Sequence, residues 1–159
     1  MPPYFLDFEA FRYRKESFQI KELTMLDVDK PLTPLYYIFA PTNQWQCLTE
    51  DERLQFRYQF NHIHQLHWNE GHSRYCKECI WYHVKTVFPY SDRAVTYVMG
   101  KEKMDFLQKE FPGLHLVEYN VTFKTLPEIP KTLICPFKEH GEHCTYRKTL
   151  RLFQHYTNQ

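Results

Sequence analysis

A strand-helix-strand unit in the second half of the chain constrains the fold most. Residues 94–99 and 114–119 are short apolar runs rich in β-branched or aromatic side chains, as is typical of strands. Residues 101–111 between them have apolar side chains at helical spacing, and Gly100 separates this helix from the first run. Two strands joined through a helix are normally parallel neighbours in one sheet, since the helix crosses its face. The unit therefore predicts an α/β fold.

Three apolar runs precede this unit, over residues 4–8, 17–28 and 35–39. The Asp29-Lys30-Pro31 turn signal separates the second run from the third, so the three runs are expected to form an antiparallel meander. Further helices are predicted over 49–66, 73–88 and 145–156. The whole chain, 1–159, is thus predicted to be one α/β domain with a mixed five-stranded sheet flanked by helices.

Composition excludes several classes of protein. The chain has 43% hydrophobic residues, a formal net charge of +1 and a mean hydropathy of −0.62, which favour a soluble globular domain without a strong basic field. No apolar run approaches the ~20 residues that span a bilayer, so no membrane association is expected. The N-terminus lacks a signal-peptide pattern, and the five cysteines are an odd number. We therefore expect reduced thiols and a cytoplasmic or nuclear location.

The segment from Cys135 to Cys144 is the densest group of metal-ligand side chains. Two thiols flank His140 and His143 within ten residues, directly before the last predicted helix. Thiolate and imidazole are the ligands that zinc prefers, and a loop of this length can bring three of them to one point. A metal site is predicted here; the alternative is a metal-free turn.

Two other groups of ligand-type residues favour simpler interpretations. Cys76 and Cys79 lie within a predicted helix and are expected to be helix-face thiols, with a redox pair or a second pair of zinc ligands as alternatives. A histidine-rich stretch does not place its members on one helix face, and we expect no metal there; it comprises His62, His64, His67 and His72.

An Asp-x-Glu pair, Asp7 and Glu9, comes at the end of the first strand run. Residues two apart in a strand point to the same face, so these carboxylates could hold divalent cations for phosphoryl transfer. The pair and the element order resemble DnaQ-type exonucleases of the ribonuclease H-like fold. The resemblance implies a magnesium or manganese site with Asp105 as a further carboxylate and His143 as general base. Lys148, however, stands where the family has its last Asp, and its charge would repel a metal ion.

The chain also resembles Maelstrom-type domains, a branch of this fold found in animal small-RNA silencing, and uncharacterised arthropod and viral proteins of similar layout. The shared features are the early Asp-x-Glu, a Gly-x-x-Lys segment (Gly100 to Lys103) and the late Cys…His…Cys cluster. In that family the exonuclease carboxylates are largely lost and zinc staples the first strand to the last helix. The resemblance implies a structural zinc held by the following residues, with His143 as the alternative histidine: Glu9, Cys135, His140 and Cys144.

The resulting functional prediction is an RNA-binding, catalytically degenerate exonuclease-like module, in RNA silencing or antiviral pathways and with a silencing-pathway protein as a further partner. RNA or another single-stranded nucleic acid would contact basic residues in three groups; the predicted contacts are Arg12, Lys101, Arg147, Lys148 and Arg151, with Arg14, Lys15 and Lys103 beside them. The alternatives are an active metal-dependent 3'-5' exonuclease or ribonuclease, and a protein-interaction adaptor.

Overall fold

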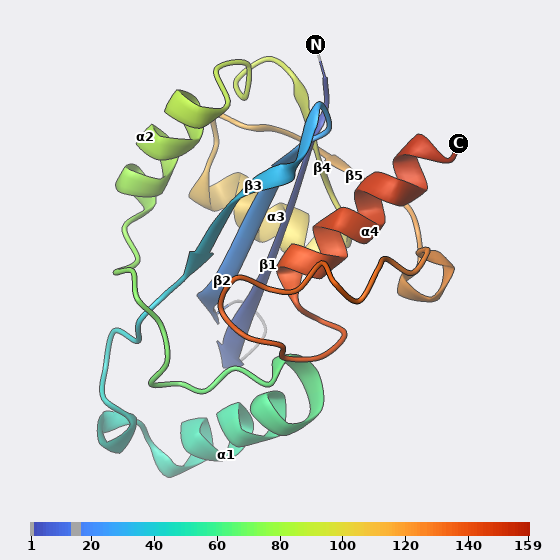
Figure 1. Ribbon diagram of the computed structural model, residues 1–159. Helices are drawn as coiled ribbons and strands as arrows, with labels where there is room; N and C mark the ends of the chain where they lie inside the picture. The colour runs from blue at the N-terminus through green and yellow to red at the C-terminus, as the bar shows by residue number, and fades with distance from the viewer. Residues whose placement is uncertain (1, 14–16) are drawn as a thin grey trace.

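The computed structural model describes residues 2–13 and 17–159, and its centre is a mixed five-stranded sheet with the order β3-β2-β1-β4-β5 (Figure 1). Strands β1 (Tyr4–Tyr13), β2 (Ser17–Asp27) and β3 (Lys30–Ile38) form an antiparallel meander. Strands β4 (Val95–Val98) and β5 (His115–Glu118) continue the sheet parallel to β1. The predicted α/β class and the mixed five-stranded sheet are confirmed.

Helices cover both faces of this sheet. Helices α2 (Lys77–Val87) and α3 (Lys101–Glu110) pack on one face, and α4 (Thr145–Thr157) crosses the other, in front of the sheet in Figure 1. Helix α1 (Glu50–Gln59) lies at the end of β1. Short helical turns complete the structure: η1 (Trp45–Cys47), the π-helical η2 (Phe60–His64) and η3 (Phe123–Thr125).

Alternation along β1 divides the core into two layers. Leu6 and Phe8 belong to the apolar cluster under α2 and α3, whereas Phe5 belongs to the cluster that contains Leu150 and Leu152 of α4. Because side chains alternate between faces of a strand, Asp7 and Glu9 follow Phe5 onto the α4 side. The fold thus directs two carboxylates at the underside of α4.

Several boundaries and one surface assignment differ from the sequence prediction. Helix α2 begins at Lys77 rather than near residue 73, and β3 begins at Lys30 rather than at residue 35. The first strand extends from Tyr4 to Tyr13 rather than ending near residue 8, because it pairs with β2 over its whole length. The helix predicted over 49–66 begins at the Thr49 capping box as expected but changes to the π-helical turn after Gln59. Lys148, predicted to contact nucleic acid from the last helix, is only 2% exposed. No helix in the described part of the chain is long and apolar enough to cross a membrane.

The loop that follows η2 returns alongside the end of β3, and Gly71 allows this close approach. Ser73 forms a parallel bridge with Phe39, and Ala40 N–H donates to Ser73 O at 2.8 Å. Gly71 has φ +131°, and a Cβ atom built there would lie 2.2 Å from Phe39 O. Only glycine avoids this backbone clash.

Gly71→Ala should therefore destabilise the fold more than Gly100→Ala does. Both glycines have positive φ, but a Cβ atom on Gly100 (φ +97°) would meet nothing within 4 Å. We expect a loss of about 1–3 kcal/mol for Gly100→Ala from backbone strain alone, and a larger loss for Gly71→Ala. Urea unfolding measures both changes. Equal losses would show that the approach of Gly71 to Phe39 does not constrain the fold.

Candidate functional site

Three carboxylates of the β1–β2 hairpin lie buried on the α4 side of the sheet. Asp7 and Glu9 come from β1, and Glu22 lies directly opposite Glu9 in the β1–β2 register. Cross-strand partners in an antiparallel pair share a face of the sheet, so Glu22 joins the other two. The residues are 0%, 7% and 0% exposed, respectively. Buried carboxylates are costly unless they have charged or hydrogen-bonding partners, and two separate sets of partners are present.

Two lysines partner Asp7 and Glu9. The Nζ of Lys148 from α4 lies 3.0 Å from Asp7 Oδ2 and 3.1 Å from Glu9 Oε1. The Nζ of Lys103 from α3 lies 2.9 Å from Asp7 Oδ1 and 3.1 Å from Glu9 Oε1. Each carboxylate therefore contacts both ammonium groups. We call these four residues the carboxylate–lysine centre.

The electrostatics of this centre favour the charged forms. Burial by itself would raise the pKa of Glu9, but the charges and hydrogen bonds of Lys103 and Lys148 lower it to about 2. Burial would lower the pKa of Lys148, yet the charges of Asp7 and Glu9 outweigh burial and raise that pKa. Two positive and two negative charges thus balance inside the fold. A divalent cation could bind these carboxylates only by displacing the lysines.

The other predicted catalytic residues are placed differently. His143 is close to the centre, with its Nδ1 3.9 Å from Glu9 Oε1 and its ring stacked on Phe123. Burial, followed by the charge of Lys148, lowers the pKa of His143. Asp105 does not join Asp7 and Glu9: its side chain is 57% exposed and pairs with Lys101 one turn earlier in α3. The set of Asp7, Glu9 and Asp105 predicted as one metal site is therefore not assembled.

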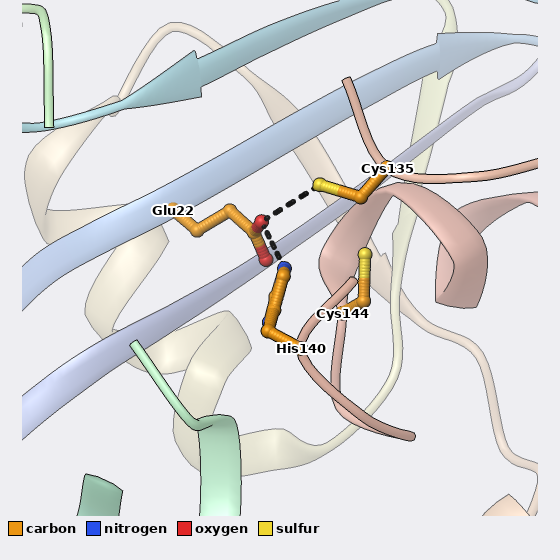
Figure 2. Close-up of side chains that lie close together, drawn as sticks. All are labelled: Glu22, Cys135, His140 and Cys144. Atoms are coloured by element: carbon orange, nitrogen blue, oxygen red, sulfur yellow. Dashed lines mark hydrogen bonds and ion pairs between the residues drawn. The ribbon is translucent and has the colours of Figure 1, made fainter. Parts of the chain in front are cut away.

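Glu22 belongs to a second cluster, with Cys135, His140 and Cys144 (Figure 2). One potential ligand atom from each residue lies within 4.8 Å of the others, and all four residues are buried. His140 Nε2 lies 2.7 Å from Glu22 Oε2, and Cys135 Sγ lies 3.7 Å from the same oxygen. His140 Nδ1 is 2.9 Å from the carbonyl oxygen of His64, which fixes the ring orientation. This metal-type cluster is compatible with zinc.

The carboxylate of this cluster is a correction to the sequence prediction, which assigned it to Glu9. Glu9 is held by Lys103 and Lys148, and Glu22, its cross-strand neighbour, faces the thiols instead. The Asp-x-Glu motif directed attention to the first strand. The signal for Glu22 was also present: Lys21 and Glu22 are adjacent charged residues between the apolar residues Ile20 and Leu23 of a strand. A charge in such a position needs a buried partner. His140, rather than His143, is the histidine of the cluster.

Glu22 also fixes the start of α4. Its Oε1 accepts a hydrogen bond of 2.8 Å from the backbone N–H of Thr145, the first residue of the helix. The hydroxyl groups of Thr24 and Thr145 are 2.8 Å apart, which adds a second link between β2 and this helix end. A carboxylate at a helix N-terminus satisfies a free N–H group and interacts favourably with the helix dipole. Glu22 thus positions Cys144, which precedes the helix.

The thiols and the imidazole of the cluster influence one another. A hydrogen bond from Cys144 is the largest contribution that lowers the pKa of Cys135, and the same bond raises the pKa of Cys144. Burial would lower the pKa of His140, but its hydrogen bonds with Cys135 and Glu22 raise it to about 10. A thiolate is therefore favoured at Cys135, whereas His140 and Cys144 hold protons that a bound metal ion would displace.

The basic residues predicted to contact nucleic acid lie in several different environments. Lys148 is buried in the carboxylate–lysine centre, while Arg147 and Arg151 donate to backbone carbonyls of the segment before the metal-type cluster. Arg12 pairs with Glu102, and Lys101 pairs with Asp105. Arg14 and Lys15 lie outside the described residues. Most of these charges therefore already have partners within the protein.

The remaining ligand-type residues do not extend the cluster. Cys76 and Cys79 form a disulfide at the start of α2, in contrast to the reduced thiols expected from the sequence; the free cysteines of the described chain are Cys47, Cys135 and Cys144. The proximity of the two cysteines in a Cys-x-x-Cys turn is the physical reason. Of the histidine-rich stretch, His64 is buried and contributes its carbonyl to His140.

Comparison with protein-family models and with curated proteins finds no match to this chain. The features of the molecule that bear on its function are the carboxylate–lysine centre, the metal-type cluster and the surface around them.

Acidification should weaken the fold through Glu9. Because the folded-state pKa of about 2 lies below the ordinary 4.5, this carboxylate stabilises the fold fully above about pH 4.5 and progressively less as the pH falls towards 2. The difference amounts to the order of 3 kcal/mol. At neutral pH we expect a larger free energy of unfolding for the wild type than for Glu9→Gln. This difference between the two proteins should become smaller as the pH falls. Glu128→Gln, at an exposed glutamate, is the matched control; a gap independent of pH would contradict the ion-pair assignment.

Proposed function

We propose that this protein is a catalytically inactive ribonuclease H-like module that contains a structural zinc ion and binds RNA or another single-stranded nucleic acid. The observation that carries this proposal is the carboxylate–lysine centre. Two lysine ammonium groups contact the Asp-x-Glu pair to which exonucleases of this fold would bind their metal ions. The place of the protein in RNA silencing or antiviral defence stays a prediction from the family resemblance.

The sheet supports the ribonuclease H-like part of the proposal. An antiparallel β1–β2–β3 meander followed by β4 and β5 parallel to β1 is the arrangement expected from the strand and helix order of that fold. The Asp-x-Glu pair lies on the central strand β1. Helix α1 contacts this strand, and η2 contacts α1. A β-bulge between Glu9 and Ala10 interrupts the strand at this point, and bulges often occur beside functional sites.

Loss of catalysis follows from charge. Two-metal phosphoryl transfer needs open carboxylate oxygens that accept divalent cations. Asp7 and Glu9 are neutralised by Lys103 and Lys148, and Lys148 is buried, so its departure would leave an uncompensated charge in the interior. Asp105, the third carboxylate of a nuclease site, points to solvent. An active nuclease is therefore less favoured than a binding module.

The chemistry of the metal-type cluster supports a structural zinc. Two thiols, one imidazole and one carboxylate are ligand types that zinc accepts, and four protein ligands leave no open position for activated water. The ion would join β2, through Glu22, to the start of α4, through Cys144. It would therefore staple the second strand, rather than the first, to the last helix.

A cleft beside the carboxylate–lysine centre supports strand binding. It has a volume of about 490 Å³ and is lined by Glu9, Lys103, Arg12, Tyr58 and Ile63, among others. Tyr58 is 61% exposed and Ile63 is 36% exposed, so ring and aliphatic surface is open to a strand. Arg12 and Lys103 lie beside this surface, although each also pairs with carboxylates of the protein. Exposed aromatic rings that stack on bases, combined with cations that contact phosphates, are how single strands are commonly bound without sequence selectivity.

Purified protein should contain one zinc ion per chain. We expect Glu22→Gln and Cys144→Ser to lose most of the metal and Glu9→Gln, the cross-strand neighbour, to retain it. Chelation should lower the thermal unfolding temperature of the wild type, because the metal stabilises only the folded state. Elemental analysis of the three variants checks this. Zinc retained in Glu22→Gln and lost in Glu9→Gln would reverse the ligand assignment.

Single-stranded RNA should bind at the cleft with an affinity that falls as salt is raised, since phosphate contacts release counterions. Tyr58→Ala should weaken binding about tenfold, from the loss of one stacked base. Tyr82→Ala, which removes a 72% exposed tyrosine on α2, should leave it unchanged. Fluorescence anisotropy of labelled RNA measures both.

Equal effects of the two tyrosine substitutions would contradict binding at the cleft. The same RNA incubated with manganese is expected to remain intact. Cleavage that Glu9→Gln abolishes would instead establish the nuclease.

A further inference from the structure

A second, aromatic pocket lies on the opposite side of α1 from the cleft. Gln55, Tyr58 and Gln59 line the cleft, whereas Phe56 and Arg57 line the pocket. With about 100° between successive helical residues, these two sets occupy opposite faces of the helix. The pocket has a volume of about 370 Å³, at the lower end of the range of small-molecule sites. It is therefore sized for a nucleoside rather than for a large ligand.

The floor of the pocket is a rigid aromatic stack. The rings of Phe56 and Trp68 stack with centroids 5.1 Å apart and an 8° angle between their planes, and Phe11 packs edge-on against both. The indole N–H of Trp68 donates to Asn43 O at 2.8 Å, and the buried Lys21 Nζ donates to Trp68 O at 2.8 Å. The indole N–H and the backbone carbonyl of Trp68 thus have hydrogen-bond partners within the protein. The surface that Trp68 contributes to the pocket is therefore aromatic carbon.

The rim combines ring faces with polar groups. The guanidinium of Arg57 lies 5.6 Å from the ring centroid of Trp45, and the ring of His67 stacks on Phe60 with centroids 4.0 Å apart. Two amide side chains, Asn61 and Asn69, also line the pocket, and neither hydrogen-bonds to another residue in the described part of the chain. Each amide offers both a donor and an acceptor to a ligand.

We infer that this pocket binds a nucleobase, as a free nucleoside or nucleotide or as one unstacked base of a strand. A planar heterocycle can stack on the rings of the rim, where Trp45 is half-buried and His67 is exposed. Its edge can then pair with the amides of Asn61 and Asn69, as bases do in single-stranded recognition. Arg57 can contact an acceptor edge or a phosphate. An aliphatic ligand would fill the same volume but would make no hydrogen bond to either amide, and both exposed amides would stay with water. The combination of ring faces and amide edges therefore favours a base.

This inference goes beyond the proposed strand binding. The pocket shares no lining residue with the cleft, and it contains no member of the carboxylate–lysine centre or of the metal-type cluster. A mononucleotide should accordingly bind the pocket even if the cleft binds no strand.

The test uses the tryptophans of the pocket itself. The chain has three tryptophans, of which Trp45 and Trp68 line the pocket and Trp81 lies on α2. In a Trp81→Phe background, all tryptophan fluorescence therefore comes from the pocket walls. Titration with AMP, GMP, CMP and UMP, and with the matching nucleosides, should give saturable quenching by at least one base. Calorimetry on the wild type repeats the measurement without the Trp81 substitution.

Matched variants then locate the site. Asn61→Ala combined with Asn69→Ala should weaken nucleotide binding about tenfold or more, because each base-edge contact contributes of the order of 1 kcal/mol or more. Asn158→Ala, at an exposed asparagine after α4, and Tyr58→Ala in the cleft should leave nucleotide affinity unchanged. Stronger binding of nucleotides than of nucleosides would assign the phosphate contact, which Arg57→Ala should then remove.

Three results would overturn the inference. One is the absence of saturable binding by any nucleotide or nucleoside up to millimolar concentration. The second is nucleotide binding that the double asparagine variant does not weaken. The third is binding of N-acetyl-tryptophanamide as tight as that of any nucleoside, which would identify the pocket as a site for an aromatic side chain of a peptide. None of these results depends on RNA binding at the cleft, which Tyr58→Ala tests separately.

Discussion

The arrangement of the carboxylate–lysine centre and the metal-type cluster depends on the ion pairs that Lys148 forms with Asp7 and Glu9. Helix α4 brings this cation under the sheet, where both carboxylates are almost fully buried. Desolvated carboxylates are tolerated only with partners of opposite charge, and removal of one partner from a buried pair costs several kcal/mol. The apolar residues Leu150 and Leu152 dock α4 on the sheet, while Lys148 fixes the position at which it docks.

Docking of α4 also assembles the metal-type cluster. Cys144 lies four residues before Lys148, and the first N–H of the helix donates to Glu22. Glu9 and Glu22 are cross-strand partners on the same face of the sheet. The carboxylate from β1 contacts the lysines, and the carboxylate beside it on β2 faces the thiols. A one-residue slip between β1 and β2 would turn these carboxylates to the opposite face. The two centres therefore depend on the same strand register, although they have separate partners.

The high aromatic content, 18%, has a structural explanation, and the proposed base binding would add a functional one. Phe5 and Phe8 pack with other rings in the two layers of the core. Phe11, Phe56 and Trp68 form a third group that joins the end of β1 to α1 and lines the aromatic pocket. Helix α1 thus has an aromatic pocket on one side and the cleft beside the carboxylate–lysine centre on the other. In the proposed function, exposed rings of both surfaces would stack on unpaired bases.

Local patterns in the sequence determined the elements of this fold and most of the metal-type cluster. Strand and helix types follow from apolar periodicity and turn residues, and Cys135, His140 and Cys144 are close in the chain. Which side chains pair across long separations in the chain was decided only by the tertiary structure. Glu22 replaced Glu9 beside the thiols because of the strand register, and Lys148 became buried because α4 faces two carboxylates from the other end of the chain. Such choices are made by cross-strand partners and desolvated charges, which no local periodicity records.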